Sequence, residues 1–170
     1  MADIQKLANK LFKWEGGFVN DPTDRGGATN MGVTISTWRQ VGYDKDGDGD
    51  IDTDDIRLLT RADAMLVLKK FYWDRWQADH IIDQKVANIL VDWVWASGRW
   101  GIIIPQLILD VKSDGIVGPH TLIKLNRVDS KIFLREVYTA RVTFLQKIVK
   151  NDPSQVKFIY GWLRRLNDFL

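Results

Sequence analysis

Three acidic residues near the N-terminus have types and spacings that suit acid–base chemistry. Glu15 is followed by Asp21, six residues later, and by Asp24, nine residues later. Two carboxyl groups can divide such work when their surroundings keep one protonated, as the donor, and the other ionised. The chain between them must therefore turn back, so that both groups can face one reacting bond.

The segment that positions Glu15 is a predicted helix over residues 3–14. Its apolar residues recur at three- and four-residue spacings on one face: Ile4, Leu7, Ala8, Leu11 and Trp14. Asp3 is a suitable N-cap, and residues 16–17, both glycine, are a stop signal. Glu15 then lies at the negative end of the helix dipole, which disfavours the ionised carboxylate by a few tenths to about 1 kcal/mol. Desolvation by Trp14 and Phe18 would also favour a carboxylic acid that keeps its proton until it donates it.

Glycines and an Asp-Pro turn dominate residues 16–35, and they predict short strands joined by turns in a small hairpin lobe. A loop that folds back over the helix end would bring a second carboxylate across a cleft from Glu15. Glycosidases use such pairs about 5 Å apart, with retention, or roughly 6.5–9.5 Å apart, with inversion. The spacing does not choose between these geometries. It also leaves open that Glu15 is a surface residue and that Asp21 and Asp24 only form turns.

A second acidic cluster, DKDGDGDIDTDD over residues 44–55, has the spacing of a calcium-binding loop. Gly49 permits the sharp turn that such a loop needs at its sixth position. The predicted oxygen ligands are four carboxylates and one backbone carbonyl, from Asp44, Asp46, Asp48 and Asp55 and from Asp50. Seven aspartates within twelve residues repel one another without a counter-ion. We therefore expect one structural calcium ion here, against the alternative of a solvated acidic loop.

The remainder of the sequence predicts helices. A short helix capped by Ser36 or Thr37 runs to Val41, and a long one runs from a capping box of Thr60 and Asp63 to Trp76. Further helices are predicted over residues 89–98, 100–110 and 130–149, and after Pro119 and Pro153. The expected fold class is mainly α, a helical domain with a small β-hairpin lobe near the N-terminus.

Composition excludes several classes of function. The 170 residues contain no cysteine and two histidines, so disulfides, thiolate metal sites and cysteine nucleophiles are absent. A formal net charge of +2 is too small for a nucleic-acid binder. No segment approaches the ~20 apolar residues of a membrane span. The N-terminus lacks the apolar stretch of a signal peptide, so we expect synthesis in the cytoplasm.

One long motif resembles a known family. EGGFVNDPTDRGGATNMGVT, residues 15–34, resembles the signature of the bacterial and phage N-acetylmuramidases of glycoside hydrolase family 108. The similarity continues through FYWDRW at 71–76, VDWVWASG at 91–98 and DGIVGPHTL at 114–122. The last of these is similar to the start of the family's C-terminal peptidoglycan-binding region. The closing helix of the family is matched by Phe158, Gly161, Trp162 and Arg164.

The resemblance implies a lysozyme-like fold in which Glu15 is the catalytic acid. It places Asp24 and Thr29 on the small lobe as catalytic partners, while Asp21 as the second carboxylate, or Glu15 acting alone, stays open. The implied substrate-binding residues are Asn20, Asp21, Tyr72, Trp73 and Ser97. Indole faces stack on pyranose rings, but large aromatic residues also fill cores. For Tyr72 and Trp73, the alternative is therefore a place in a helix core.

The resemblance also divides the chain into two regions. Residues 1–98 would form the catalytic region, with the acidic loop 44–55 inserted, and residues 99–170 a helical peptidoglycan-binding region packed on it in one compact unit. The predicted function is a muramidase that hydrolyses the β-1,4 bond between N-acetylmuramic acid and N-acetylglucosamine, with calcium as a structural ion and no cofactor for catalysis.

The alternatives are a lytic transglycosylase and a non-catalytic peptidoglycan-binding protein. The only partner that we expect is peptidoglycan. We expect a monomeric, endolysin-like enzyme of bacterial or prophage origin that reaches the cell wall after release or by non-classical export.

Overall fold

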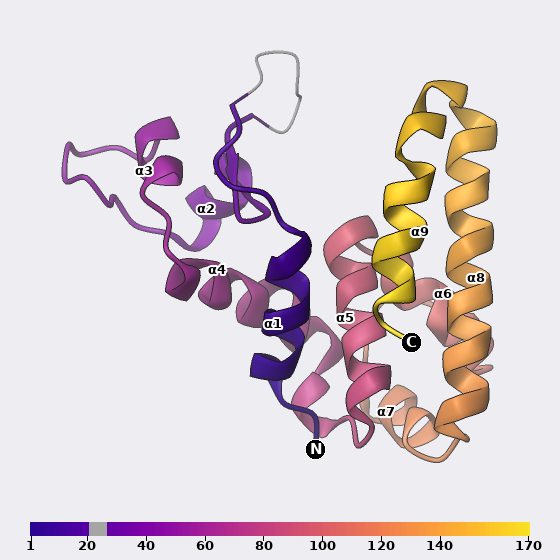
Figure 1. Ribbon diagram of the computed structural model, residues 1–170. Coiled ribbons are helices and arrows are strands. Elements are labelled where there is room, and N and C mark those ends of the chain that lie inside the picture. The colour runs from indigo at the N-terminus through magenta and orange to yellow at the C-terminus, as the bar shows by residue number, and fades with distance from the viewer. Residues whose placement is uncertain (21–26) are drawn as a thin grey trace. The chain divides into compact units, whose positions relative to one another are not determined.

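Helices account for most of the protein in the computed structural model, which describes residues 1–20 and 27–170 (Figure 1). One small antiparallel sheet accompanies them in this part of the chain. The fold class is therefore mainly α with a small β lobe near the N-terminus, as the sequence predicts. The described residues divide into unit 1, Met1–Asp3 with Tyr72–Leu170, and unit 2, Ile4–Phe71. This division follows Phe71, whereas the sequence places its division after Gly98.

Unit 2 holds the N-terminal helix, the hairpin and three further short helices. Its α-helices and strands are α1 (Ile4–Trp14), β1 (Thr29–Asn30), β2 (Val33–Thr34), α2 (Ile35–Val41), α3 (Thr53–Arg57) and α4 (Arg61–Leu68). The apolar face predicted for α1 is the buried one, with Leu7, Ala8 and Leu11 inaccessible to solvent. The three- and four-residue spacing of those side chains thus gives α1 one buried apolar face.

The hairpin of unit 2 turns within two residues. Thr29 pairs with Thr34, and Asn30 pairs with Val33, in an antiparallel register. Met31 and Gly32, between the strands, have φ values of 48° and 76°. Two consecutive residues with positive φ are the mark of a type I′ turn, whose twist matches that of the strands it joins.

Capping side chains set where the short helices begin. Thr60 and Asp63 form a reciprocal capping box at the start of α4, which confirms the prediction for this pair. The N-cap of helix α2 is Thr34, at the end of β2, and not Ser36 or Thr37, so the helix begins two or three residues earlier than predicted. The single helix predicted from Thr60 to Trp76 is wrong. After Leu68 the backbone continues as a π-helical stretch, Lys69–Trp73, and then as a 3₁₀ turn, Asp74–Trp76.

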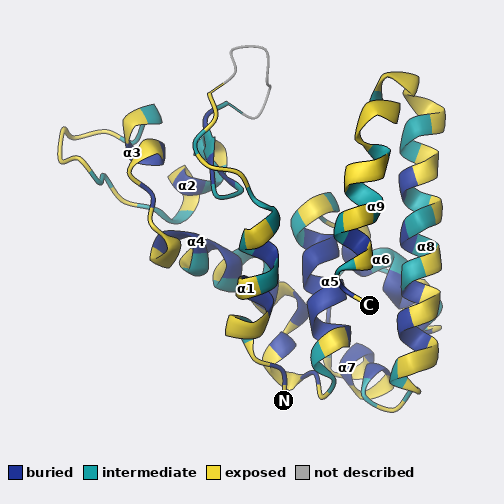
Figure 2. Cartoon of the chain, viewed as in Figure 1, coloured by how far each residue is buried: buried dark blue, intermediate teal, exposed yellow. Residues whose placement is uncertain are grey.

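Unit 1 is built around a buried helix. Its helices are η2 (Asp74–Trp76), η3 (Ala78–His80), α5 (Gln84–Ser97), α6 (Trp100–Ile108), α7 (Pro119–Leu125), α8 (Ser130–Asn151), η4 (Pro153–Phe158) and α9 (Ile159–Asn167). Residues 86–94 of α5 are all buried, as Figure 2 shows. Helices α6 and α8 both pack against α5, and α9 packs against α8. Helix α5 is therefore the centre of the unit 1 core.

The contact between α5 and α6 is close enough to require a glycine. A Cβ atom on Gly101 would lie 2.5 Å from the backbone nitrogen of Val94 and 2.6 Å from the carbonyl carbon of Trp93. Trp76 uses the same contact, since its Nε1 donates to the Gly101 carbonyl at 3.2 Å. No helix in the described part of the chain has both the length and the apolar character that crossing a membrane would require.

A buried charge cluster joins α5, α8 and α9. Asp92 on α5 has no exposed surface, and its Oδ1 accepts from the Nε and Nη2 of Arg165 at 3.0 and 2.7 Å. Nη2 of Arg141 lies 2.6 Å from the other carboxylate oxygen. The Arg141 guanidinium is also 5.8 Å from the Trp93 ring centroid. One carboxylate thus holds two guanidinium groups, and through them three helices.

Candidate active site

Glu15 lies at the C-terminal end of α1. The helix ends at Trp14, and Glu15 follows as a half-buried residue before the two glycines. The sequence prediction of an acidic side chain at this helix end is therefore confirmed.

The chain that follows Glu15 is held to the hairpin by backbone hydrogen bonds. The N–H of Met31 donates to the Gly16 carbonyl at 3.2 Å. Val19 and Thr29 exchange two bonds of 2.8 Å each, so Val19 extends the sheet as an isolated bridge. These bonds place Thr29 on a strand that pairs with the segment leaving Glu15, and its hydroxyl donates to the Gly27 carbonyl at 3.4 Å.

The structure does not describe two of the predicted partners of Glu15. Asp21 and Asp24 lie outside the described residues, so the identity of the second carboxylate stays a prediction. Asn20, predicted to bind substrate, is exposed directly before them. The structure thus links the segment 16–19, which follows Glu15, to the hairpin through Met31 and Thr29.

Asn30 and Arg57 support this lobe, and sequence reasoning missed both. The buried Asn30 amide donates to the Ile56 carbonyl at 2.9 Å and so ties β1 to α3. The Arg57 guanidinium lies 4.2 Å from the ring centroid of Phe18, on the segment after Glu15. The sequence does offer one sign that Asn30 is buried. It stands directly before a two-residue turn, on the same side of the strand pair as the buried Val33.

The other predicted substrate-binding residues belong to unit 1. The Tyr72 ring packs at 48° on Trp95, with a centroid distance of 4.6 Å, and stays partly accessible. Ser97 is the half-buried last residue of α5. Trp73 is different: it has no exposed surface, and its Nε1 donates to Asp79 at 2.8 Å. An indole without an exposed face cannot stack on a sugar, so we assign Trp73 to the core.

Comparison with known proteins decides the family. A family model described as Glycosyl hydrolase 108 matches residues 8–98, which is more than half of the 170 residues. The chain belongs to glycosyl hydrolase family 108. A second model, described as Predicted Peptidoglycan domain, matches residues 99–167 of this family 108 enzyme. The family predicted from residues 15–34 is therefore confirmed.

A solved structure agrees with this identification. SagA of Brucella abortus is 26% identical to the family 108 enzyme and superposes on it with a TM-score of 0.77. The similarity covers 98% of this chain and 92% of that chain. No curated protein matches the chain. The family models and this likeness make the protein a glycoside hydrolase of the muramidase type that acts on peptidoglycan, as the sequence predicts.

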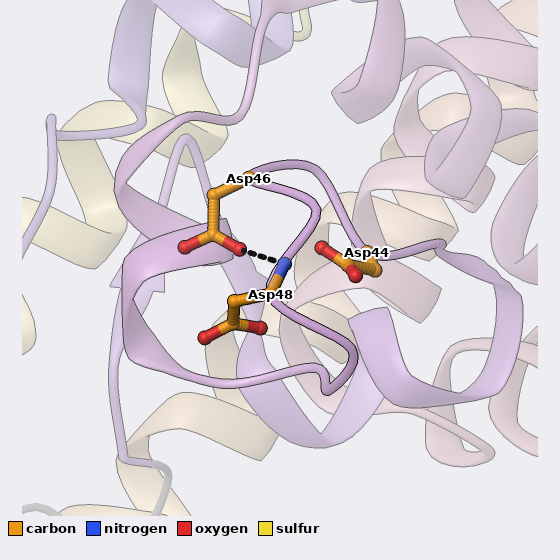
Figure 3. Close-up of side chains that lie close together, drawn as sticks. All are labelled: Asp44, Asp46 and Asp48. Atoms are coloured by element: carbon orange, nitrogen blue, oxygen red, sulfur yellow. Dashed lines mark hydrogen bonds between the residues drawn. The ribbon is translucent and has the colours of Figure 1, made fainter.

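The acidic loop of this family 108 enzyme gathers its carboxylates in two groups. Asp44, Asp46 and Asp48 each offer an oxygen within 4.8 Å of the others (Figure 3). The dashed line in Figure 3 is the hydrogen bond from the Asp48 amide to the Asp46 carboxylate, 3.2 Å long. A second group joins Asp50, Asp52 and Asp55. The five predicted ligands are thus divided between two neighbouring groups.

Backbone N–H groups and like charges act in opposite directions in this loop. The amides of Gly49 and Gly47 donate to Asp44 at 2.8 and 2.5 Å and hold its pKa below the ordinary value. Repulsion from Asp48 raises the pKa of Asp50. The loop therefore fixes the Asp44 carboxylate as an anion, and at the same time crowds negative charge beside it.

The last predicted ligand, Asp55, has a structural task of its own. Its buried carboxylate accepts from the Lys45 amide at 2.5 Å and from the Asp52 amide at 2.7 Å. The second bond is half of the capping box that begins α3. Asp55 thus closes the loop by joining its two ends, and this explains why it belongs to the second group of carboxylates.

An ion pair anchors the base of the loop to α4. Nζ of Lys45 lies 2.7 Å from Oδ2 of Asp63, and the Tyr43 hydroxyl donates to Oδ1 at 3.3 Å. Burial opposes the charge of Asp63, but the Lys45 ammonium and Thr60 hold the pKa of this carboxyl below its ordinary value. The same pair raises the pKa of Lys45. The loop and the α4 capping box therefore share one carboxylate.

Proposed function

We propose that Glu15 is the catalytic acid of this muramidase. The observation that carries the proposal is the place of Glu15 at the end of α1, in a segment bonded to the hairpin through Gly16, Val19 and Thr29. These bonds anchor the backbone directly after Glu15, and general acid catalysis requires a positioned side chain. Glu15 would donate its proton to the glycosidic oxygen as the bond from the anomeric carbon of N-acetylmuramic acid breaks.

The remaining roles follow from the order of residues on the small lobe. We assign Asp24 as the carboxylate that stabilises the oxocarbenium-like transition state or activates water, and Thr29, on β1, as a further catalytic residue. Asn20, Asp21, Tyr72 and Ser97 are proposed to bind the sugars or their N-acetyl groups. Water then adds to the anomeric carbon, and its proton passes to the basic group.

The products of digestion test hydrolysis against its chemical rival. A lytic transglycosylase closes a 1,6-anhydro ring without adding water, so its products are lighter by one water molecule. Mass spectrometry of muropeptides released from purified peptidoglycan should show reducing N-acetylmuramic acid ends. Anhydro ends would contradict hydrolysis. Sedimentation of the protein with peptidoglycan, without release of any fragment, would indicate a binding protein instead.

We propose in addition that the acidic loop binds one calcium ion. Calcium takes six to eight oxygen ligands, and the loop supplies clustered carboxylates from Asp44, Asp46 and Asp48 within reach of one another. Asp55 and the carbonyl of Asp50 would complete the shell after a small shift of the second group. The repulsion that raises the pKa of Asp50 supports a need for a counter-ion.

Calcium should stabilise the folded enzyme. An ion present at a hundred times its dissociation constant adds about 2.7 kcal/mol to the free energy of unfolding. Thermal unfolding of metal-stripped protein, with and without millimolar calcium, measures this effect. Asp46→Asn should reduce it, while Asp110→Asn, the same change at an exposed position outside the loop, should not. An unchanged melting temperature in calcium would mean that the loop is only solvated.

The calcium effect should be separable from catalysis. The loop connects α2 and α3 of unit 2 and is not part of the Glu15 segment. Most lytic activity well below the melting temperature should therefore survive chelation. Complete and reversible loss of lysis at low temperature would instead show that the ion organises the catalytic site.

We further propose that the enzyme works as a monomer on the bacterial cell wall, as an endolysin of bacterial or prophage origin, and that it does not bind nucleic acid. The support is the substrate, which lies outside the cytoplasmic membrane, and the small net charge of +2. Sedimentation velocity measures whether the enzyme is a monomer. Lysis of cells that express the enzyme, with and without a membrane-permeabilising partner, measures whether it acts as an endolysin.

A further inference from the structure

A groove runs between α6 and α8 on the surface of unit 1. It encloses about 530 Å³, a size typical of small-ligand sites. Its walls are the exposed ends of α6 side chains and the facing side of α8, with Trp100, Ile104 and Leu107 opposite Phe144, Lys147 and Asn151. All these residues belong to the 99–167 region that the peptidoglycan family model matches.

Phe144, which lines the groove, belongs to an aromatic cluster that reaches into the core. The Phe144 ring meets the buried Trp93 ring edge-on, with 6.0 Å between the ring centroids, and its centroid lies 6.5 Å from that of the Trp100 ring. Trp100 itself is 53% exposed, and Leu107 beside it is 61% exposed. A half-exposed indole beside other apolar side chains offers a surface of the kind on which a pyranose ring stacks.

The rim of the groove carries positive charge only. Lys147 and Asn151 are its polar lining residues, and Lys147 forms no ion pair within the described residues. From Val137 to Asn151, α8 carries Arg141, Lys147 and Lys150 and no acidic residue. The groove therefore offers an apolar face, an amide and a free ammonium group to one ligand.

A neighbouring hollow on the same helices lacks this combination. It is lined by Ile108, Thr139 and Ala140, with both Arg135 and Glu136. The opposite charges cancel there, and no aromatic side chain faces the space. Selection of an anionic ligand with an apolar ring face is therefore a property of the Trp100 groove in particular.

We propose that the Trp100 groove is a second, non-catalytic site that binds the muramyl sugars of peptidoglycan. Trp100 stacks on a pyranose ring, Asn151 bonds an N-acetyl or hydroxyl group, and Lys147 pairs with the carboxylate of the lactyl group or of the stem peptide. This inference rests on peptidoglycan being the substrate. It adds a site through which unit 1 holds the polymer while catalysis proceeds elsewhere.

Binding of the full-length enzyme to peptidoglycan sacculi tests the proposal. In the inactive Glu15→Gln background, Trp100→Ala should weaken sedimentation with sacculi on the order of tenfold, as loss of a stacking tryptophan does at binding sites. Lys147→Gln should weaken binding less and reduce its dependence on salt. Tyr160→Ala, which removes a 79% exposed aromatic outside the groove, should leave binding unchanged.

The active enzyme supplies the second measurement. Trp100→Ala should raise the sacculus concentration needed for half-maximal lysis and leave the maximal rate unchanged, with partial rescue by Trp100→Phe. Equal binding by wild type and Trp100→Ala would overturn the proposal, even if Glu15→Gln is inactive and the muramidase assignment stands. Loss of self-association in Trp100→Ala, with sacculus binding unchanged, would overturn it in favour of a second copy of the chain as the occupant.

Discussion

Glu15→Gln should abolish lysis of cell walls while the protein stays folded. The amide has the shape of the acid but cannot give a proton to the leaving oxygen. General acid catalysis contributes on the order of a hundredfold or more, and the loss should reach at least that size. The measurement is the fall in turbidity of a peptidoglycan suspension, together with the thermal unfolding curve of the variant.

The sequence offers a matched control for this substitution. Glu136, the one other glutamate of the chain, is exposed on α8. Glu136→Gln makes the same chemical change there and should alter the lytic rate less than twofold. If correctly folded Glu15→Gln protein lyses walls at the wild-type rate, Glu15 is not the acid, and the catalytic carboxylate has to be sought among the aspartates of the small lobe.

Local features of the structure were predictable because their physical causes are local. The periodic apolar residues of α1 place Glu15 at a helix end. Thr60 and Asp63 cap α4 at three-residue spacing, which any reader of the sequence can see. The glycine-rich stretch after Glu15 predicts a hairpin. Its last residue, Thr34, both ends strand β2 and is the N-cap of helix α2. When one residue both ends a strand and caps a helix, the sequence does not show where the first element stops and the second starts.

Features that depend on distant residues were not predictable in this way. Trp73 reads equally well as a groove residue or a core residue, and only its burial and its bond to Asp79 decide for the core. Asp55 fits position 12 of a calcium loop, yet its carboxylate is used by two backbone amides. The α-helix that follows Thr60 ends at Leu68, and the segment after it holds Trp73 and Trp76, whose complete burial no local spacing reveals.

The Asp92 cluster is the clearest case of this kind, and its removal should have the largest effect on stability. Asp92 is separated by 73 residues from Arg165, and no spacing in the sequence pairs them. Asp92→Asn keeps the size of the side chain but removes the charge that holds two guanidinium groups. Removing one partner of a buried ion pair costs about 3–5 kcal/mol, because the charge left behind stays desolvated.

That loss corresponds to a fall of roughly 6–20 °C in melting temperature for a chain of this length. Thermal unfolding followed by tryptophan fluorescence measures it, since Trp93 lies beside Arg141. Lys112→Ala removes the ammonium of the Lys112–Asp114 pair, whose lysine is 87% exposed, and should change stability by less than about 1 kcal/mol.

A double-mutant cycle then separates the charge from the packing. Arg141 is buried, and its Nη1 has no hydrogen-bond partner in the described residues, so it depends on Asp92 for compensation. Arg141→Met in the Asp92→Asn background should restore part of the lost stability, because it removes an uncompensated charge and keeps an apolar chain of similar length. If Asp92→Asn behaves like Lys112→Ala, both guanidinium groups must reach solvent or other acceptors, and the three helices are held by apolar packing alone.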